Sequence, residues 1–166
     1  MEAALNRRDL LKAFTAVAFT TLQLPAAEPG APLFFTKDEF ALLDALTEIL
    51  IPTDKHSPGA HTAGVAAYID RSVAEAFLPE DKASWRNGLA AVNSLSQDMH
   101  SKPFLSTTSR QQTDLLKRME SGKQPFFGQL KETTVYTYYS SSVGIHQEMD
   151  YKGNVILEQF AGYDAT

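Results

Sequence analysis

Apolar residues recur at intervals of three and four along most of this chain, which is the pattern of amphipathic helices. The clearest stripe consists of Phe40, Leu43, Leu46 and Leu50. In front of it, Thr36 and Glu39 have the spacing of a capping box, and Phe35 is placed to form a hydrophobic staple with Phe40. Because Pro52 cannot continue a helix, the sequence predicts a helix that is capped by Thr36 and ends near Leu50.

Four further helices are predicted from the same spacing. They cover Val65–Phe77, Asp81–Met99, a segment capped by Ser106 or Thr108 that ends before Gly122, and a segment from Pro125 to Tyr139. Their apolar positions are Val65, Ile69, Val73 and Phe77; Trp85, Leu89, Val92 and Leu95; Leu115, Leu116 and Met119; and Phe127, Leu130, Thr134 and Tyr138. Alternating strand patterns are almost absent, apart from a possible short strand at Val155–Leu157. We therefore expect an all-α fold, with about five main helices in a compact irregular bundle and one long ordered loop over Pro52–Gly64.

The N-terminal segment follows a different pattern. A basic and leucine-containing motif, followed by a mostly apolar run over residues 13–24, is typical of a twin-arginine export signal. The motif consists of Arg7, Arg8, Leu10, Leu11 and Lys12. The apolar run is shorter than the roughly 20 residues that span a bilayer, and an amphipathic helix packed on the core is the alternative. We expect a signal segment over 1–27, a linker over 28–35, a helical domain over 36–166, and a periplasmic location.

Composition narrows the function classes. Hydrophobic residues make up 43% of the chain, which is enough to bury a core. A net charge of −5 disfavours nucleic acid as a partner, and no run of Lys and Arg suggests binding to an anionic lipid surface. The absence of cysteine excludes disulfides, thiolate zinc sites, iron–sulfur clusters, covalent haem attachment and cysteine nucleophiles.

No motif for catalysis, cofactor binding or metal binding stands out. The four histidines, which are His56, His61, His100 and His146, lack a metal-ligand spacing. The glycines form neither a dinucleotide fingerprint nor a nucleophile elbow. We therefore expect no catalytic, cofactor or metal site in this chain. Two alternatives stay open: a small exported enzyme that uses His56, His61 and Asp70, or a free-standing periplasmic binding module with a tyrosine-lined groove.

Two regions have an unusual composition. The segment 51–65 is dense in turn-forming residues, and the segment 136–163 holds six aromatic residues: Tyr136, Tyr138, Tyr139, Tyr151, Phe160 and Tyr163. Aromatic side chains with a polar end suit protein interfaces, because one end can be buried while the other keeps a hydrogen bond. Tyrosines that cover a small core would give the same composition, so both interpretations remain.

In these two regions the chain resembles the gluconate 2-dehydrogenase subunit 3 family. The matching residues are Ile51-Pro52, Asp54, Pro58-Gly59-Ala60, Ala63-Gly64-Val65 and Ile69-Asp70. A second stretch, Tyr138–His146 with Tyr151–Asn154, is similar to members associated with glucoside or glycoside dehydrogenases such as glucoside 3-dehydrogenase. Two positions depart from the pattern: Leu10 replaces the phenylalanine common in the export motif, and Lys152-Gly153 stands where some relatives have Gly-Gly.

The resemblance implies a division of labour between subunits. This chain would be the non-catalytic small subunit of a hetero-oligomeric, FAD-dependent sugar, glycoside or gluconate-type dehydrogenase. Its partner would be a flavoprotein of the glucose–methanol–choline type that holds FAD and the catalytic base, and a c-type cytochrome could accept the electrons. The small subunit would stabilise and co-export that partner in a chaperone-like way, with membrane contact only through partners or the export machinery. The candidate interface comprises Ile51, Pro52, Pro58, Gly59, Tyr68, Ile69, Tyr138, Tyr139, Tyr151, Gly153 and Asn154.

Overall fold

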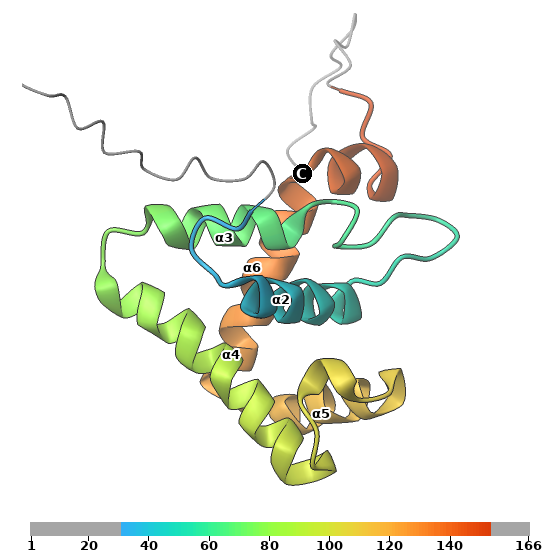
Figure 1. Cartoon of the computed structure of the whole chain (residues 1–166). Helices are drawn as coiled ribbons and strands as arrows, with labels where there is room; N and C mark the ends of the chain where they lie inside the picture. The colour runs from blue at the N-terminus through green and yellow to red at the C-terminus, as the bar shows by residue number, and fades with distance from the viewer. Residues whose placement is uncertain (1–30, 154–166) are drawn as a thin grey trace, which may run out of the picture. The chain divides into compact units, whose positions relative to one another are not determined.

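Five α-helices make up most of residues 31–153, the part of the chain that the computed structural model describes (Figure 1). They are α2 (Lys37–Leu50), α3 (Val65–Glu75), α4 (Pro79–His100), α5 (Ser109–Ser121) and α6 (Pro125–Ser140). A 3₁₀ turn, η2 (Phe104–Ser106), precedes α5, and a π-helical turn, η3 (Gly144–Glu148), follows α6. The all-α prediction is confirmed, and no strand occurs within this described part.

The chain divides into two units, Met1–Ala31 and Pro32–Thr166. The described residues belong almost entirely to the second unit. Three predictions lie outside the described residues: the export motif Arg7–Lys12, the strand at Val155–Leu157, and the interface residue Asn154.

Two helices begin with the side-chain caps that the sequence predicts. Thr36 Oγ1 accepts a hydrogen bond from the backbone N–H of Glu39 at 3.2 Å, and the Glu39 carboxylate accepts one from the Thr36 N–H at 2.8 Å. Thr108 and Gln111 form the equivalent pair at the start of α5, so Thr108 is the cap, whereas Ser106 lies in η2. Such caps are typically worth about 1 kcal/mol each.

The second predicted helix is two residues shorter than expected. It ends at Glu75 because Ala76 has an extended backbone (ψ 132°), and Pro79 then opens α4. The residue before a proline avoids helical geometry, which favours a break here. Phe77 therefore lies outside the helix with 94% of its surface exposed, and its predicted place in the apolar stripe of that helix is wrong.

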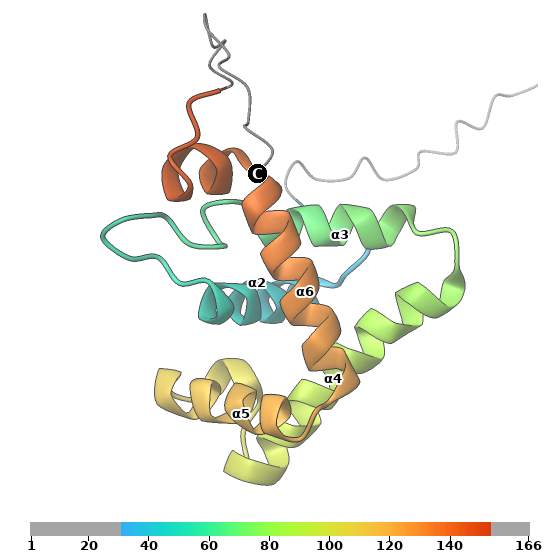
Figure 2. The same cartoon turned by 180° about the vertical axis from the view of Figure 1, so that it is seen from behind.

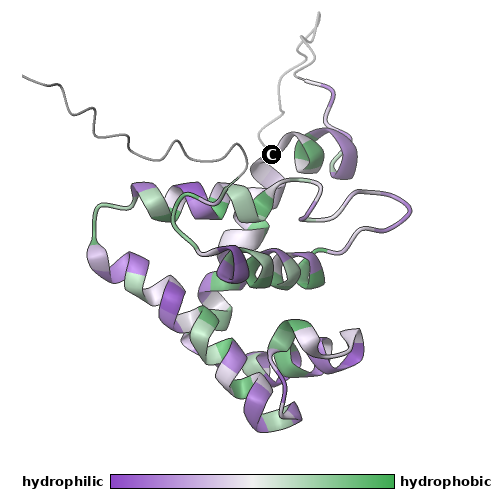
Figure 3. Ribbon diagram, viewed as in Figure 1, coloured by the Kyte–Doolittle hydropathy of each residue, from purple (hydrophilic) through white to green (hydrophobic). Residues whose placement is uncertain are grey.

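The core lies where α2 and α6 meet the other helices. Seen from behind, α6 passes across α2 and α3 (Figure 2). Each helix contributes fully buried apolar side chains, among them Leu43, Leu46, Ile69, Leu89, Leu115, Leu130 and Tyr138. Hydrophobic residues concentrate on α2, whereas the loop that follows it is mostly polar (Figure 3).

A close approach between α4 and α6 closes one end of the core. Gly88 lies so near the ring of Phe126 that a Cβ at this position would be 2.0 Å from a ring carbon. The Phe126 ring also packs edge-on against Trp85, with centroids 5.7 Å apart, and Trp85 in turn meets Phe35 at 6.4 Å. The missing side chain of Gly88 is therefore what lets the aromatic group fit between the two helices.

Candidate subunit interface

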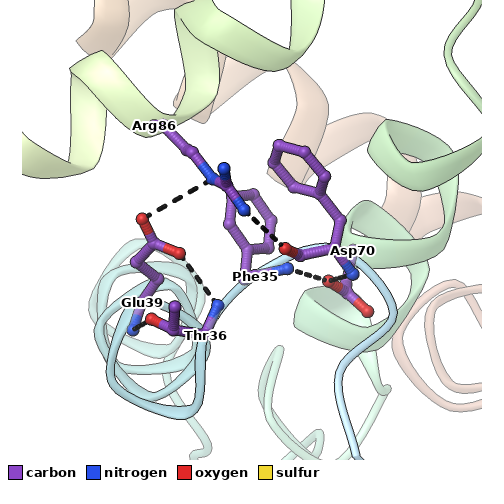
Figure 4. A network of polar contacts seen from close by, with 6 residues as sticks. Phe35, Thr36, Glu39, Asp70 and Arg86 are labelled. Carbon is purple, nitrogen blue, oxygen red and sulfur yellow. Dashed lines mark hydrogen bonds and ion pairs between the residues drawn. The ribbon is translucent and has the colours of Figure 1, made fainter. Parts of the chain in front are cut away.

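A buried carboxylate holds the segment that precedes α2. Asp70, on the inner face of α3, is 3% exposed. Its Oδ2 accepts a hydrogen bond from the Leu33 N–H at 2.5 Å. Its Oδ1 accepts hydrogen bonds from the N–H groups of Phe34 and Phe35 at 3.0 and 2.9 Å, and Figure 4 shows Asp70 beside Phe35. Three backbone donors thus compensate the charge of one buried carboxylate, which burial would otherwise make costly.

Arg86 of α4 fastens the same segment from the other side. Its Nη2 donates to the Phe34 carbonyl oxygen at 3.0 Å, and its guanidinium lies 4.3 Å from the centre of the Phe34 ring. Its Nε is 3.8 Å from a carboxylate oxygen of the capping residue Glu39 (Figure 4). Residues 33–35, predicted as part of a linker, are therefore fixed to the helical unit, and Phe35 is buried in its core.

The loop over residues 51–64 is closed at its base by Glu48. One carboxylate oxygen of Glu48 accepts from the Thr53 N–H at 2.8 Å, and the other accepts from the His61 N–H at 2.9 Å. Partial burial tends to raise the pKa of Glu48, but the backbone hydrogen bonds from His61 and Thr53 outweigh it and lower the pKa overall. The charged carboxylate therefore joins the two sides of the loop.

Gly59 is required by this closure. Its N–H donates to Thr53 Oγ1 at 2.8 Å. A Cβ at this position would lie 2.5 Å from both a carboxylate oxygen of Glu48 and the backbone nitrogen of Thr53. The Pro58-Gly59-Ala60 motif therefore has a packing reason: only glycine leaves room for the carboxylate that ties the loop together.

Asp54 shapes the outer turn of the loop. Its Oδ1 accepts hydrogen bonds from the N–H groups of His56 and Ser57 at 2.7 and 3.0 Å. The hydrogen bond from His56, followed by the one from Ser57, holds the pKa of the Asp54 carboxyl below its ordinary value. The side chain is thus engaged by its own turn.

Tyr138 connects this loop to α6. Its hydroxyl donates to the carbonyl oxygen of Pro58 at 2.7 Å and lies 2.7 Å from Ser57 Oγ. The Tyr138 side chain is fully buried, and its ring packs edge-on against that of Tyr139, with centroids 5.3 Å apart. Tyr138 therefore fixes the inner end of the loop and also packs against the exposed Tyr139.

Asp70 and His61, two of the residues that an enzyme could use, each form hydrogen bonds with different parts of the chain. Both oxygens of Asp70 are occupied by backbone amides, and His61 Nδ1 lies 2.6 Å from Asp44 Oδ2. The hydrogen bond to Asp44, together with its negative charge, raises the pKa of His61 above its ordinary value. Among residues 31–153, no three His, Asp or Glu side chains gather as metal ligands would. The structure does not bring His56, His61 and Asp70 together as a catalytic group.

An apolar strip runs along the outside of α6. Val135, Tyr136 and Tyr139 share one side of the helix and are 40%, 68% and 41% exposed. The opposite side carries the buried residues Phe127, Leu130, Thr134 and Tyr138. No Asp, Glu, Lys or Arg occurs from Thr133 to Gln147. Tyrosine enrichment and charge depletion are the composition of interface centres. We call Val135, Tyr136 and Tyr139 the outer strip of α6.

The predicted interface residues fall into two groups. Pro52, Tyr68, Tyr139, Tyr151 and Gly153 are exposed, and Ile51 and Pro58 are half-buried. Gly59, Ile69 and Tyr138 are buried, so they shape the surface from beneath and offer no exposed side chain to a partner. Sequence reasoning missed Val135 and left Tyr136 out of the interface. The uncharged run around them was the available signal.

No helix of the described residues is long and apolar enough to cross a membrane. Neither the curated proteins nor the solved structures contain a match. The profile of one family, described as gluconate 2-dehydrogenase subunit 3, matches residues 37–155, which include all five helices and the loop between α2 and α3. The chain therefore belongs to the gluconate 2-dehydrogenase subunit 3 family.

Proposed function

We propose that this chain is the non-catalytic small subunit of a periplasmic, FAD-dependent sugar, glycoside or gluconate-type dehydrogenase complex. The observation that carries the proposal is the family match over residues 37–155. Within the complex, FAD and the catalytic base belong to a flavoprotein partner of the glucose–methanol–choline type, and a c-type cytochrome takes up the electrons. The small subunit supplies a folded surface and no redox group.

Stabilisation of the partner follows from binding. A protein that binds only the folded form of its partner shifts the folding equilibrium, by about 2.7 kcal/mol when its free concentration is 100 times the Kd. The outer strip of α6 offers such a binding surface. Its apolar side chains are exposed to water, and the free energy of the system falls when a partner covers them.

Export of the pair depends on the N-terminal motif. The twin-arginine pathway accepts folded proteins, so a flavoprotein can bind FAD and this subunit in the cytosol before it crosses the membrane. The motivation is the combination of Arg7 and Arg8 near the N-terminus with membership of a dehydrogenase-subunit family. The flavoprotein would then need no leader of its own.

A free-standing binding module is the second candidate. The observation in its favour is the hollow beside the exposed Tyr68 on α3, which Arg71, Ser72 and Glu75 also line. This module would bind a small polar molecule without a protein partner. A small hydrolase that uses His56, His61 and Asp70 is less well supported, because Asp70 and His61 are engaged with other groups.

One experiment separates these functions. The full-length chain is co-expressed with the protein of the neighbouring reading frame, and the extract is analysed by gel filtration with detection at flavin wavelengths. We expect a yellow complex that contains both chains. Turnover of a sugar by the purified small chain alone, or a monodisperse monomer in the presence of the flavoprotein, would contradict the proposal.

A variant of the leader tests the export role. Replacement of both Arg7 and Arg8 by lysine should retain dehydrogenase activity in the cytosolic fraction. A matched variant, Lys37→Arg, lies in the helical domain and should leave the distribution of activity unchanged. Normal periplasmic activity in the double-lysine variant would show that another chain carries the export signal.

A further inference from the structure

We infer that the segment Pro52–Pro58 is a preformed docking loop, and that Lys55 at its tip pairs with a carboxylate on the flavoprotein subunit. The inference rests on the proposed function, since it assigns a contact surface within that complex. It goes further by naming the loop, the residue and the chemistry of the matching site on the partner.

The first argument is the position of the loop. Between α2 and α3 the chain extends beyond the ends of both helices, and it does so in both views of the structure (Figures 1 and 2). Pro52 to His56 are all exposed. A projecting segment of this kind can enter a recess on another protein, which the flatter surfaces of the helices cannot do.

The second argument is that the loop is held in one conformation. Glu48 joins its two sides through Thr53 and His61, and the Ala60 N–H donates to the Ile51 carbonyl oxygen at 2.9 Å across its base. Tyr138 fixes Pro58 from α6. A loop that is already ordered loses little conformational entropy on binding, so its contacts contribute more fully to affinity.

The third argument is the charge at the tip. The Asp54 carboxylate is turned toward the amides of His56 and Ser57, whereas Lys55 is exposed and forms no ion pair within the described residues. Other exposed lysines, such as Lys117 in α5, also lack an ion pair within the described residues, so it is the place of Lys55 on the projecting loop that distinguishes it. On a chain of net charge −5, an unpaired cation on a projecting loop favours a carboxylate on the partner.

The fourth argument is continuity with the outer strip of α6. The strip ends at Tyr139, whose ring packs against Tyr138, and the Tyr138 hydroxyl is bonded to Pro58 at the inner end of the loop. The loop and the strip are thus connected through adjacent residues. Because Tyr138 is itself buried, this link fixes the position of the loop relative to the strip.

The test measures binding of the full-length chain to the purified FAD-loaded flavoprotein at low and at high salt. Lys55→Glu should slow association and weaken binding about tenfold at low salt, with a smaller effect at high salt, because exposed charges are screened. Lys55→Arg should bind like the unaltered chain. The matched control Lys117→Glu changes an exposed lysine of α5 and should alter binding less than twofold.

Each result has one meaning. A tenfold, salt-dependent loss that is confined to Lys55→Glu supports the docking loop. Equal binding by Lys55→Glu and Lys117→Glu, with the unaltered chain still bound to the flavoprotein, overturns the loop assignment and leaves the proposed function intact. If the unaltered chain does not bind the flavoprotein, the proposed function fails and the docking loop fails with it. Thermal unfolding of each variant verifies that the fold is retained.

Discussion

The hydroxyl of Tyr138 in α6 donates a hydrogen bond to the carbonyl oxygen of Pro58, a residue 80 positions earlier in the chain. The same hydroxyl lies 2.7 Å from Ser57 Oγ. One buried side chain thereby couples the last helix of the core to the loop that follows the first. The position of the loop consequently depends on α6 as much as on its own turn residues.

Removal of this hydroxyl tests the coupling. Tyr138→Phe keeps the ring in the core but removes the short hydrogen bond to the Pro58 carbonyl and the contact with Ser57 Oγ, so that only the longer bond from Ser57 Oγ to the Pro58 carbonyl at 3.4 Å is left between them. A typical intramolecular hydrogen bond contributes about 0.5–1.5 kcal/mol, so we expect the free energy of unfolding in urea to fall by roughly that amount. Tyr139→Phe is the control, because Tyr139 is partly exposed and should change stability by less than about 0.5 kcal/mol. Equal effects of the two variants would contradict the coupling.

Asp70→Asn tests the anchoring of the segment before α2. The neutral amide keeps one acceptor oxygen but directs an NH₂ group toward amides that are themselves donors. We expect a loss of about 1–3 kcal/mol in stability and faster hydrogen exchange at Leu33, Phe34 and Phe35. Asp114→Asn alters an exposed carboxylate of α5 and should leave that exchange unchanged. Unaltered protection of residues 33–35 in Asp70→Asn would count against the anchor.

Two glycines in helices should respond to alanine in opposite directions. Gly88→Ala places a Cβ within the ring of Phe126, and overpacking of this kind typically costs about 1–3 kcal/mol. Gly128→Ala adds a Cβ that meets no atom within 4 Å apart from the adjoining backbone of α6, and it should stabilise α6 by about 0.5–1 kcal/mol, because alanine favours helices. Chemical denaturation measures both values. Unchanged or increased stability in Gly88→Ala would contradict the packing between α4 and α6.

The pair formed by His61 and Asp44 should give stability a pH dependence. Since Asp44 raises the pKa of folded His61 above the ordinary value of 6.5, its contribution is fully present below pH 6.5 and is lost as the pH rises through the folded pKa. An NMR titration of the imidazole should give a pKa above 6.5. In Asp44→Asn, we expect the value to move back toward 6.5. A titration near 6.5 in the unaltered chain would rule the pair out in solution.

The helices could be predicted because their signals are local. Thr36 with Glu39 and Thr108 with Gln111 act across three residues, and these pairs cap α2 and α5 as expected. The prediction for Phe77 is wrong because Phe77 lies four residues after Val73 and so fits the helical pattern of apolar residues, although the helix itself already ends at Glu75. η3 had no pattern of its own to indicate a π-helical turn.

The long-range contacts could not be predicted in the same way. The bonds of Asp70 join residues 35 to 37 positions apart, and nothing near Asp70 in the sequence identifies Leu33 or Phe35 as its partners. Composition also cannot tell that Tyr138 is buried while its neighbour Tyr139 is exposed. That difference depends on which side of α6 meets α2 and α3, so the outer strip became visible only in three dimensions.

The hydrogen bond between the Leu33 N–H and Asp70 also determines which helix first bears a force that is applied to the N-terminal side of the domain. A pull on the residues that precede Leu33 is transmitted first to α3 through the Asp70 side chain, and the first turn of α2 is shielded until that contact ruptures. A force applied to the chain ahead of Leu33 would therefore strain the middle of the domain before it strained the nearest helix.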